Sequence, residues 1–167
     1  YDNSINLEKL NDNKLKLISK ELIFSNSGEA IVISKDYTKG LVLKGYKNKD
    51  FPKLGVVKKG NLKGNSNNLS KNNISIGKEL SFNLNLGIGD KISIMSPSGI
   101  ETIIGSLPKQ ETFTISSIFD SGLADFDANI AFINLSTLER FFGLKVKDRY
   151  LEIYLNNPSN IENIKIQ

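Results

Sequence analysis

The alternation of apolar and polar side chains predicts a chain built mostly from short strands. Apolar residues at every second position, enriched in β-branched and aromatic types, are typical of strands that bury one face. The polar segments Ser25–Gly28 and Lys35–Lys39 separate the first of these runs and fit hairpin connections. The predicted strands are Lys14–Phe24, Glu29–Ser34, Gly40–Tyr46, Ile74–Ile76, Lys91–Met95, Glu111–Phe119, Asn129–Asn134 and Arg149–Leu155.

The clearest helix signal lies at Ser136–Phe142. Ser136 and Glu139 have the spacing of a capping box, in which each side chain accepts a hydrogen bond from a free backbone N–H. Gly143 follows the last apolar residue, where a left-handed glycine commonly ends a helix. These signals predict one helix of about two turns.

A shorter helix is predicted after Gly77. Leu80 and Leu84 are four residues apart and therefore share one helix face. Gly87 suits a left-handed end for this helix. Further helices are predicted near the two ends of the chain, at Asn3–Asn11 and from Pro158 onward.

The segment Lys47–Asn73 interrupts the regular pattern. It contains Pro52, Gly55, Gly60 and Gly64 and the polar run GNSNNLSKNN, which are typical of loops. We therefore predict a linker between two lobes. The order of helix, strands, linker, a β-rich unit with one helix, and then alternating strands and helices predicts an α+β fold.

One stretch, Ser96–Gln110, lies between two predicted strands and reads SPSGIETIIGSLPKQ. Pro97 and Pro108 cannot donate a backbone hydrogen bond, so strand pairing is expected to weaken beside them. Surface loops are usually polar, whereas this one is rich in aliphatic side chains. Such a loop either folds back on the end of a small β barrel or contacts another protein. The aliphatic residues are Ile100, Ile103, Ile104 and Leu107.

Composition excludes several kinds of active site. The 167 residues include no cysteine and no histidine, which removes thiol chemistry, the commonest zinc ligand and the commonest general base. The net charge of +4 comes almost entirely from scattered lysines, so nucleic-acid binding is not indicated. No apolar run approaches the roughly 18 residues of a membrane span. Because the chain starts at Tyr1, we expect it to be a fragment of a longer protein.

Three aspartates form the only compact acidic group, at Asp120, Asp125 and Asp127, next to Ser121. Carboxylates this close are compatible with a calcium site or an acid–base pair. Their spacing does not match an EF-hand, so we expect a turn in which they accept hydrogen bonds from backbone N–H groups. A small hydrolase that uses these aspartates or a Ser–Lys pair stays open. No phosphate-binding loop is present, since GxGxxG and GxxxxGK[ST] do not occur.

Three segments carry a resemblance to a known family. GDKISIMSPSG (89–99), IIGSLPKQETFTISSIFDSG (103–122) and IAFINLSTLERFFGL (130–144) are similar to the periplasmic domain of the LolC/LolF lipoprotein-releasing permeases. In that family a proline-bounded loop called the hook grips LolA, the soluble chaperone that carries lipoproteins across the periplasm. The hook corresponds to residues 96–110 here.

The resemblance implies a MacB-like periplasmic fold with two lobes. A discontinuous α/β lobe, called Porter in the family, would comprise residues 1–50 and 126–167. A β-rich inserted lobe, called Sabre, would comprise residues 51–125 and carry the hook.

The resemblance also implies the binding residues. In the hook, Ile103 stands where the family often has proline, which predicts a less rigid tip. A neighbouring surface called the pad is implied by Gln110, which matches a pad glutamine, and Ser93, which stands where some members carry a basic residue. The implied hook contacts are Pro97, Ile100, Glu101, Thr102, Ile103, Ile104, Gly105, Leu107 and Pro108.

The implied function is that of a non-catalytic domain on the periplasmic face of the bacterial inner membrane. It would belong to the permease subunit of a lipoprotein-releasing ABC transporter and need no cofactor or metal. Its implied partners are a LolA-type chaperone, a LolE-type or identical permease subunit, the lipoprotein cargo and, through a missing membrane part, a separate LolD-type ATPase. A MacB-type domain of an efflux or signalling transporter is the nearest alternative, and it is favoured if the hook packs flat on its own domain.

Overall fold

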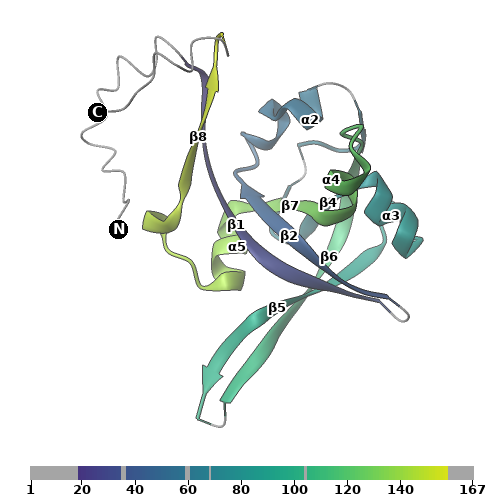
Figure 1. Cartoon of the computed structure of the whole chain (residues 1–167), viewed down its shortest axis with the longest axis vertical. Coiled ribbons are helices and arrows are strands. Elements are labelled where there is room, and N and C mark those ends of the chain that lie inside the picture. Colours follow the sequence, from purple (N-terminus) through teal and green to yellow (C-terminus); the bar gives the residue numbers. More distant parts are fainter. Residues whose placement is uncertain (1–18, 35–36, 59–60, 68, 104, 158–167) are drawn as a thin grey trace.

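The computed structural model describes residues 19–34, 37–58, 61–67, 69–103 and 105–157 (Figure 1). Within residues 98–102 and at residue 106 only the backbone is described. The predicted helix Asn3–Asn11 and the helix predicted from Pro158 lie outside these ranges.

Strands dominate the described chain, as the alternation predicts. The helices are η1 Phe51–Lys53, α2 Gly55–Lys58, α3 Lys78–Leu84, α4 Ala124–Asn129, α5 Leu135–Phe142 and η2 Val146–Asp148. The strands are β1 Ser19–Ser34, β2 Tyr37–Tyr46, β3 Leu62–Gly64, β4 Asn73–Gly77, β5 Lys91–Thr102, β6 Gly105–Phe119, β7 Ile130–Asn134 and β8 Tyr150–Leu155.

Six of the strands close into a ring. The sheet runs β2-β7-β4-β6-β5-β1, and β1 pairs back onto β2 over residues 25–34. β2 with β7 and β4 with β6 are parallel, and the other ring pairs are antiparallel. β8 pairs with the first half of β1 and β3 with the end of β6, so both branch from the ring. The α+β fold is thus confirmed as a barrel-like sheet with short helices.

Two apolar clusters hold this sheet together. The larger takes alternate residues from all six ring strands, for example Ile92 and Ile94 of β5, and adds the buried faces of α3 and α5. The second centres on Phe132, whose ring lies 5.0 Å from that of Phe119 and 5.5 Å from that of Phe51. Each strand therefore presents one face to a shared core, as period-two patterning requires.

The hairpin turn predicted at Ser25–Gly28 is wrong. β1 continues through this segment, and Ser25 and Gly28 pair with Tyr46 and Leu43 of β2. A Cβ on Gly28 would lie 2.6 Å from the ring of Phe142, so this glycine makes room for α5 rather than for a turn. Packing against Phe142 therefore explains Gly28, which the sequence analysis had assigned to a turn.

The linker predicted at Lys47–Asn73 is also wrong in part. It contains η1, α2 and β3, and Phe51, Leu54 and Leu69 are buried in the second cluster. Most of its described polar residues face solvent, with Asp50 buried, while these three apolar residues cover the sheet. The segment is therefore part of the core and not a free connection.

The predicted helix after Gly77 is confirmed as α3, with Leu80 and Leu84 buried. Its end differs from the prediction, because Asn85 and not Gly87 adopts the left-handed conformation, with φ 50°. Asparagine tolerates this region better than most residues. The N–H of Gly87 instead donates to the Asp90 carboxylate, 2.7 Å away.

The helix predicted at Ser136–Phe142 is confirmed as α5, and Gly143 ends it with φ 70°. The capping box is wrong, because the N-cap is Asn134, whose side chain accepts a hydrogen bond from the N–H of Ser136. Glu139 instead forms a two-bond pair with Arg149. The division into Porter and Sabre lobes, 1–50 with 126–167 and 51–125, stays a prediction.

Candidate functional site

The segment predicted to be the hook, residues 96–110, is a two-stranded arm and not the irregular loop that the sequence suggests. β5 and β6 extend past their predicted limits until Thr102 pairs with Gly105, and residues 103 and 104 join them. In Figure 1 this arm leaves the body of the sheet and projects from it. The six residues from 97 to 102 span about 20 Å at the usual rise of a strand. The hook is therefore a regular element held away from the core.

The two prolines lie in a single interruption of this arm. Pairing is regular up to Ser96 with Lys109 and resumes at Ile100 with Leu107. Pro97 and Pro108 both fall in the unpaired interval, which confirms that strand pairing weakens beside them.

Most described side chains of the hook are exposed, although Ser96 at its base is buried and Lys109 is half-buried. Ile103 at the tip is fully exposed and Leu107 is 52% exposed, and both prolines are exposed as well. Positions Ile100, Glu101 and Thr102 pair with Leu107, Ser106 and Gly105 through their backbones. Gly105 has φ +118°, which favours glycine after the tip. Ile104 lies outside the described residues. The hook thus presents aliphatic side chains to solvent.

The pad residues lie on one face at the base of the hook. Ser93 pairs with Thr112 and Met95 with Gln110, so all four side chains point to the same side of the β5–β6 pair. The hydroxyls of Ser93 and Thr112 are 3.3 Å apart, and Gln110 is exposed. The structure therefore brings the two predicted pad residues together on a small polar surface.

The opposite face of the same strands is tied to α5 by residues that sequence reasoning missed. Arg140 donates two hydrogen bonds to Glu111, of 2.6 and 2.9 Å. Nζ of Lys109 donates to the main-chain oxygen of Arg140 at 2.7 Å. We call these three residues the brace. No local pattern links Glu111 to Arg140, because they are 29 residues apart.

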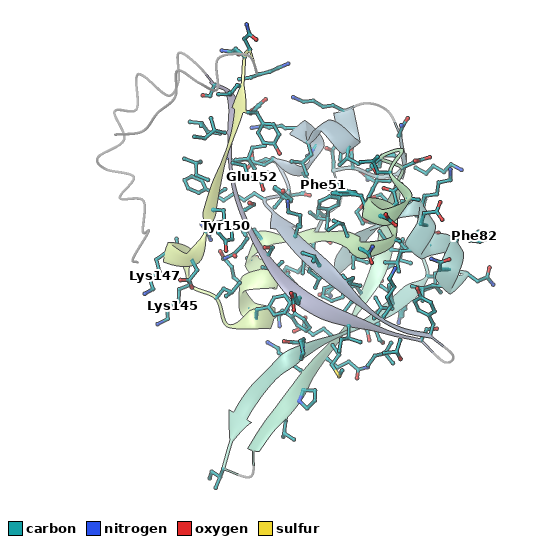
Figure 2. The ribbon with its side chains drawn as sticks, in the orientation of Figure 1. Phe51, Phe82, Lys145, Lys147, Tyr150 and Glu152 are labelled. Carbon is teal, nitrogen blue, oxygen red and sulfur yellow. The ribbon has the colours of Figure 1, made fainter. Side chains whose placement is uncertain are left out.

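A second polar cluster joins β8 to β1 and β2 around Glu152 (Figure 2). Its carboxylate accepts hydrogen bonds from the hydroxyls of Ser25 at 2.6 Å, Tyr46 at 2.7 Å and Tyr154 at 2.8 Å. Burial raises the pKa of the Glu152 carboxyl, but these three bonds and the Lys44 ammonium together hold that pKa below its ordinary value. Burial and the neighbouring carboxylate raise the pKa of both tyrosines. The cluster is fully hydrogen-bonded and stabilises the attachment of β8.

The turn predicted for the acidic group is correct only in part, because Asp125 and Asp127 lie in the first turn of helix α4. Asp127 accepts from the N–H of Ser121, and Asp120 accepts from the N–H of Gly122 and pairs with Lys78 at 3.0 Å. The Lys78 side chain and the Gly122 N–H hold the pKa of Asp120 below its usual range. Within the described ranges no group of three acidic, histidine or cysteine side chains is placed to hold a metal ion.

The solved structures that this fold matches are the outer domains of ABC-type permeases. The extracellular domain of the transporter YknZ from Gram-positive bacteria superposes with a TM-score of 0.55 and 14% identity, covering 90% of this chain and 74% of that one. The periplasmic region of MacB from Actinobacillus actinomycetemcomitans gives a TM-score of 0.53 and 11% identity, covering 90% and 66%. The predicted MacB-like periplasmic fold is therefore confirmed.

Sequence similarity points to one branch of these permeases. The chain is 28% identical over 72 residues to the lipoprotein-releasing system transmembrane protein LolC of Xylella fastidiosa strain Temecula1, and 29% identical over 68 residues to LolC of strain 9a5c. These matches cover 43% and 41% of this chain and confirm the predicted resemblance to LolC. No protein-family model matches the chain.

The chain spans only about a sixth of its LolC relatives, 17% and 16% of their lengths. Among the residues that the structure describes, no helix is both long and apolar enough to cross a membrane. The chain thus has the fold of a periplasmic permease domain and a sequence similar to LolC.

Proposed function

We propose that this chain is a periplasmic docking domain of a lipoprotein-releasing ABC permease, and that its hook captures a LolA-type lipoprotein chaperone. The observation that carries the proposal is the projecting arm with Ile103 fully exposed at its tip. An exposed aliphatic side chain at the end of a long arm fits the mouth of an apolar carrier better than a flat surface does. The similarity to LolC supports the same partner.

The free energy available from burying the exposed side chains of the arm is consistent with weak binding of the chaperone. Burying Ile103 fully and the exposed half of Leu107 would gain about 2–4.5 kcal/mol gross. Association costs about 4–15 kcal/mol, so the hook needs help from neighbouring contacts. Ser93 and Gln110 on the pad are placed to supply hydrogen bonds. Weak binding suits a chaperone that must leave with its cargo.

Under this proposal the domain is not an enzyme. ATP hydrolysis lies in a separate LolD-type subunit, reached through membrane segments, and a LolE-type or identical permease completes the transporter at the inner membrane. The acidic group and the lysines support this division of labour. Asp120 and Lys78 line a shallow recess of about 330 Å³, but they pair with each other.

The hydrolase alternative receives little support from the described residues. Ser75-Ile76-Gly77-Lys78 has the SxxK spacing of some serine hydrolases. Ser75 is completely buried and accepts a hydrogen bond from the hydroxyl of Ser117, whereas Lys78 donates to Asp120. A nucleophile buried in the sheet has no access to substrate. The MacB-type alternative shares the fold and would be favoured by a hook that packs flat on the domain, whereas Figure 1 shows the arm projecting from it.

Calorimetry with a LolA-type chaperone tests the proposal. Replacing Ile103 by aspartate should weaken binding at least tenfold, because about 1.5–3 kcal/mol of burial is lost and a charge must be desolvated. The matched control is Val146→Asp, which changes another exposed β-branched side chain, on η2. Equal binding by the parent chain and Ile103→Asp would refute the role of the hook.

A further inference from the structure

The direction of the hook depends on contacts at its base. A two-stranded ribbon alone is only marginally stable in water, and this one has a break at Pro97 and Pro108. The last regular pair before the break is Ser96 with Lys109. Pairing resumes beyond the break, from Ile100 with Leu107 to Thr102 with Gly105, so the orientation of the strands at this last regular pair influences the path of the arm.

The side-chain fork of Arg140 is the first such contact. Nη1 and Nη2 bind the two carboxylate oxygens of Glu111 separately, at 2.6 and 2.9 Å. A planar guanidinium that binds both oxygens of a carboxylate allows little rotation of either group. Arg140 lies on α5, whose neighbours Leu138 and Phe141 are buried in the larger core. The fork therefore connects the hook strand β6 to a rigid element of the body.

Lys109 provides the second contact, two residues closer to the tip. Its ammonium donates to the main-chain oxygen of Arg140, in the last turn of α5, where helix carbonyls lack partners within the helix. A cation at this end also complements the helix dipole. The same ammonium lies 3.8 Å from Glu111 and 5.7 Å from the centre of the Phe141 ring. Two residues of β6 thus hold one residue of α5, which restrains both translation and rotation of the strand.

The brace and the pad occupy opposite faces of β6. Lys109 and Glu111 point toward α5, and Gln110 between them points the other way. The contacts to α5 therefore hold the strand from behind and leave the pad and hook open. We propose that the brace sets the direction of the hook and that Arg140 is a positioning residue for capture of the carrier. This inference rests on the proposed function.

We expect loss of the brace to weaken binding of the carrier more than it lowers the stability of the fold. Arg140 is 57% exposed, and exposed ion pairs contribute little to folding. The apparent affinity, however, scales with the fraction of molecules whose hook is correctly placed. If loss of the fork reduces that fraction to about a tenth, binding weakens about tenfold with no contact to the carrier removed.

A distance measurement tests the brace without any carrier. The sequence has no cysteine, so spin labels can be placed only where they are wanted, at Ile103→Cys on the tip and Phe82→Cys on α3, both highly exposed. Pulsed electron–electron double resonance on the full chain should give one narrow distance distribution. Arg140→Gln should broaden it, and Arg140→Lys, which keeps the charge but not the fork, should restore it in part.

The control removes an equivalent pair elsewhere. Arg149 also binds both carboxylate oxygens of a glutamate, donating from Nε and Nη2 to Glu139, and both side chains are more buried than Arg140. Arg149→Gln should lower the melting temperature more than Arg140→Gln does, yet leave the hook distances and carrier binding unchanged. A purely structural role for Arg140 would make the two variants behave alike.

Carrier binding is then measured for the same variants by calorimetry. Arg140→Gln is expected to bind about three- to tenfold more weakly, with Arg140→Lys in between. An unchanged distance distribution in Arg140→Gln would overturn the brace. A broadened distribution with unchanged affinity would overturn the positioning role. If the parent chain binds no carrier, the proposed function and the capture role both fail, while the distances still decide the brace.

Discussion

The polar cluster around Glu152 makes a prediction whose size follows from its geometry. Tyr46 is 2% exposed and donates a 2.7 Å hydrogen bond to the carboxylate, whose own side chain is 24% exposed. Hydrogen bonds to charged groups contribute about 1.5–3 kcal/mol, and the partial exposure of Glu152 favours the lower end. Tyr46→Phe should therefore cost about 1.5 kcal/mol and lower the melting temperature by about 3–6 °C.

A double-mutant cycle isolates this bond. Urea unfolding is measured for Tyr46→Phe, Glu152→Gln and the double variant. The Tyr46→Phe penalty should shrink in the Glu152→Gln background, with a coupling of about 1 kcal/mol or more. Tyr150→Phe is the control, because Tyr150 lies on the same strand but is exposed, so its effect should stay within about 0.5 kcal/mol. Additive effects at positions 46 and 152 would refute the reasoning.

The same bond predicts a pH dependence. The pKa of Glu152 is lower in the folded chain than its ordinary value, so its contribution is present above the unfolded pKa and is lost as the pH falls through the folded pKa. The difference in stability between the parent chain and Tyr46→Phe should therefore be full at neutral pH and shrink at acidic pH. A difference that stays constant across this range would show that the carboxylate is not involved.

Two further substitutions test the packing and capping described above. A Cβ on Gly77 would lie 2.0 Å from the carbonyl oxygen of Asp127, so Gly77→Ala must shift the backbone and should cost about 1–3 kcal/mol in urea unfolding. The control Gly40→Ala should be harmless, because a Cβ there would meet nothing within 4 Å. Equal effects of the two substitutions would contradict this packing. Asn134→Ala removes the cap on the N–H of Ser136 and should cost about 1–2 kcal/mol, against a much smaller loss for exposed Ser136→Ala. A negligible loss in Asn134→Ala would contradict the cap.

Local patterns predicted most elements because the core is built from alternate residues of short strands. They failed where distant partners compete with local ones. Glu139 has the right spacing to close a capping box, but the structure places it on Arg149, a charged partner ten residues away. Ser25–Gly28 has the composition of a turn, yet pairing with β2 keeps it extended.

The segment around Phe51 and Leu69 illustrates a second limit. Its abundant polar residues and glycines indicate a loop, and its few apolar residues show no period. Their burial depends on packing against Phe132 and its neighbours, which no local window contains. Sparse apolar residues in a polar segment are therefore a useful signal when a sheet has two apolar faces.

For the candidate site, the two prolines and the aliphatic residues between them singled out the segment 96–110, whose role as a hook stays a prediction. Its regular hairpin geometry was missed, because prolines weigh against strands in any local argument, although here both share one unpaired interval. The brace was not predictable, since Glu111 and Arg140 meet only after β6 and α5 have packed.

The most direct test of the central claim is a cross-link from the hook tip. Because the chain lacks cysteine, Ile103→Cys can carry a single benzophenone group, and Val146→Cys provides the control position. After irradiation with a LolA-type chaperone, the account predicts cross-links from position 103 to residues that line the carrier's apolar cavity, and none from position 146. Cross-links to the outer surface of the carrier, or equal yields from both positions, would contradict it.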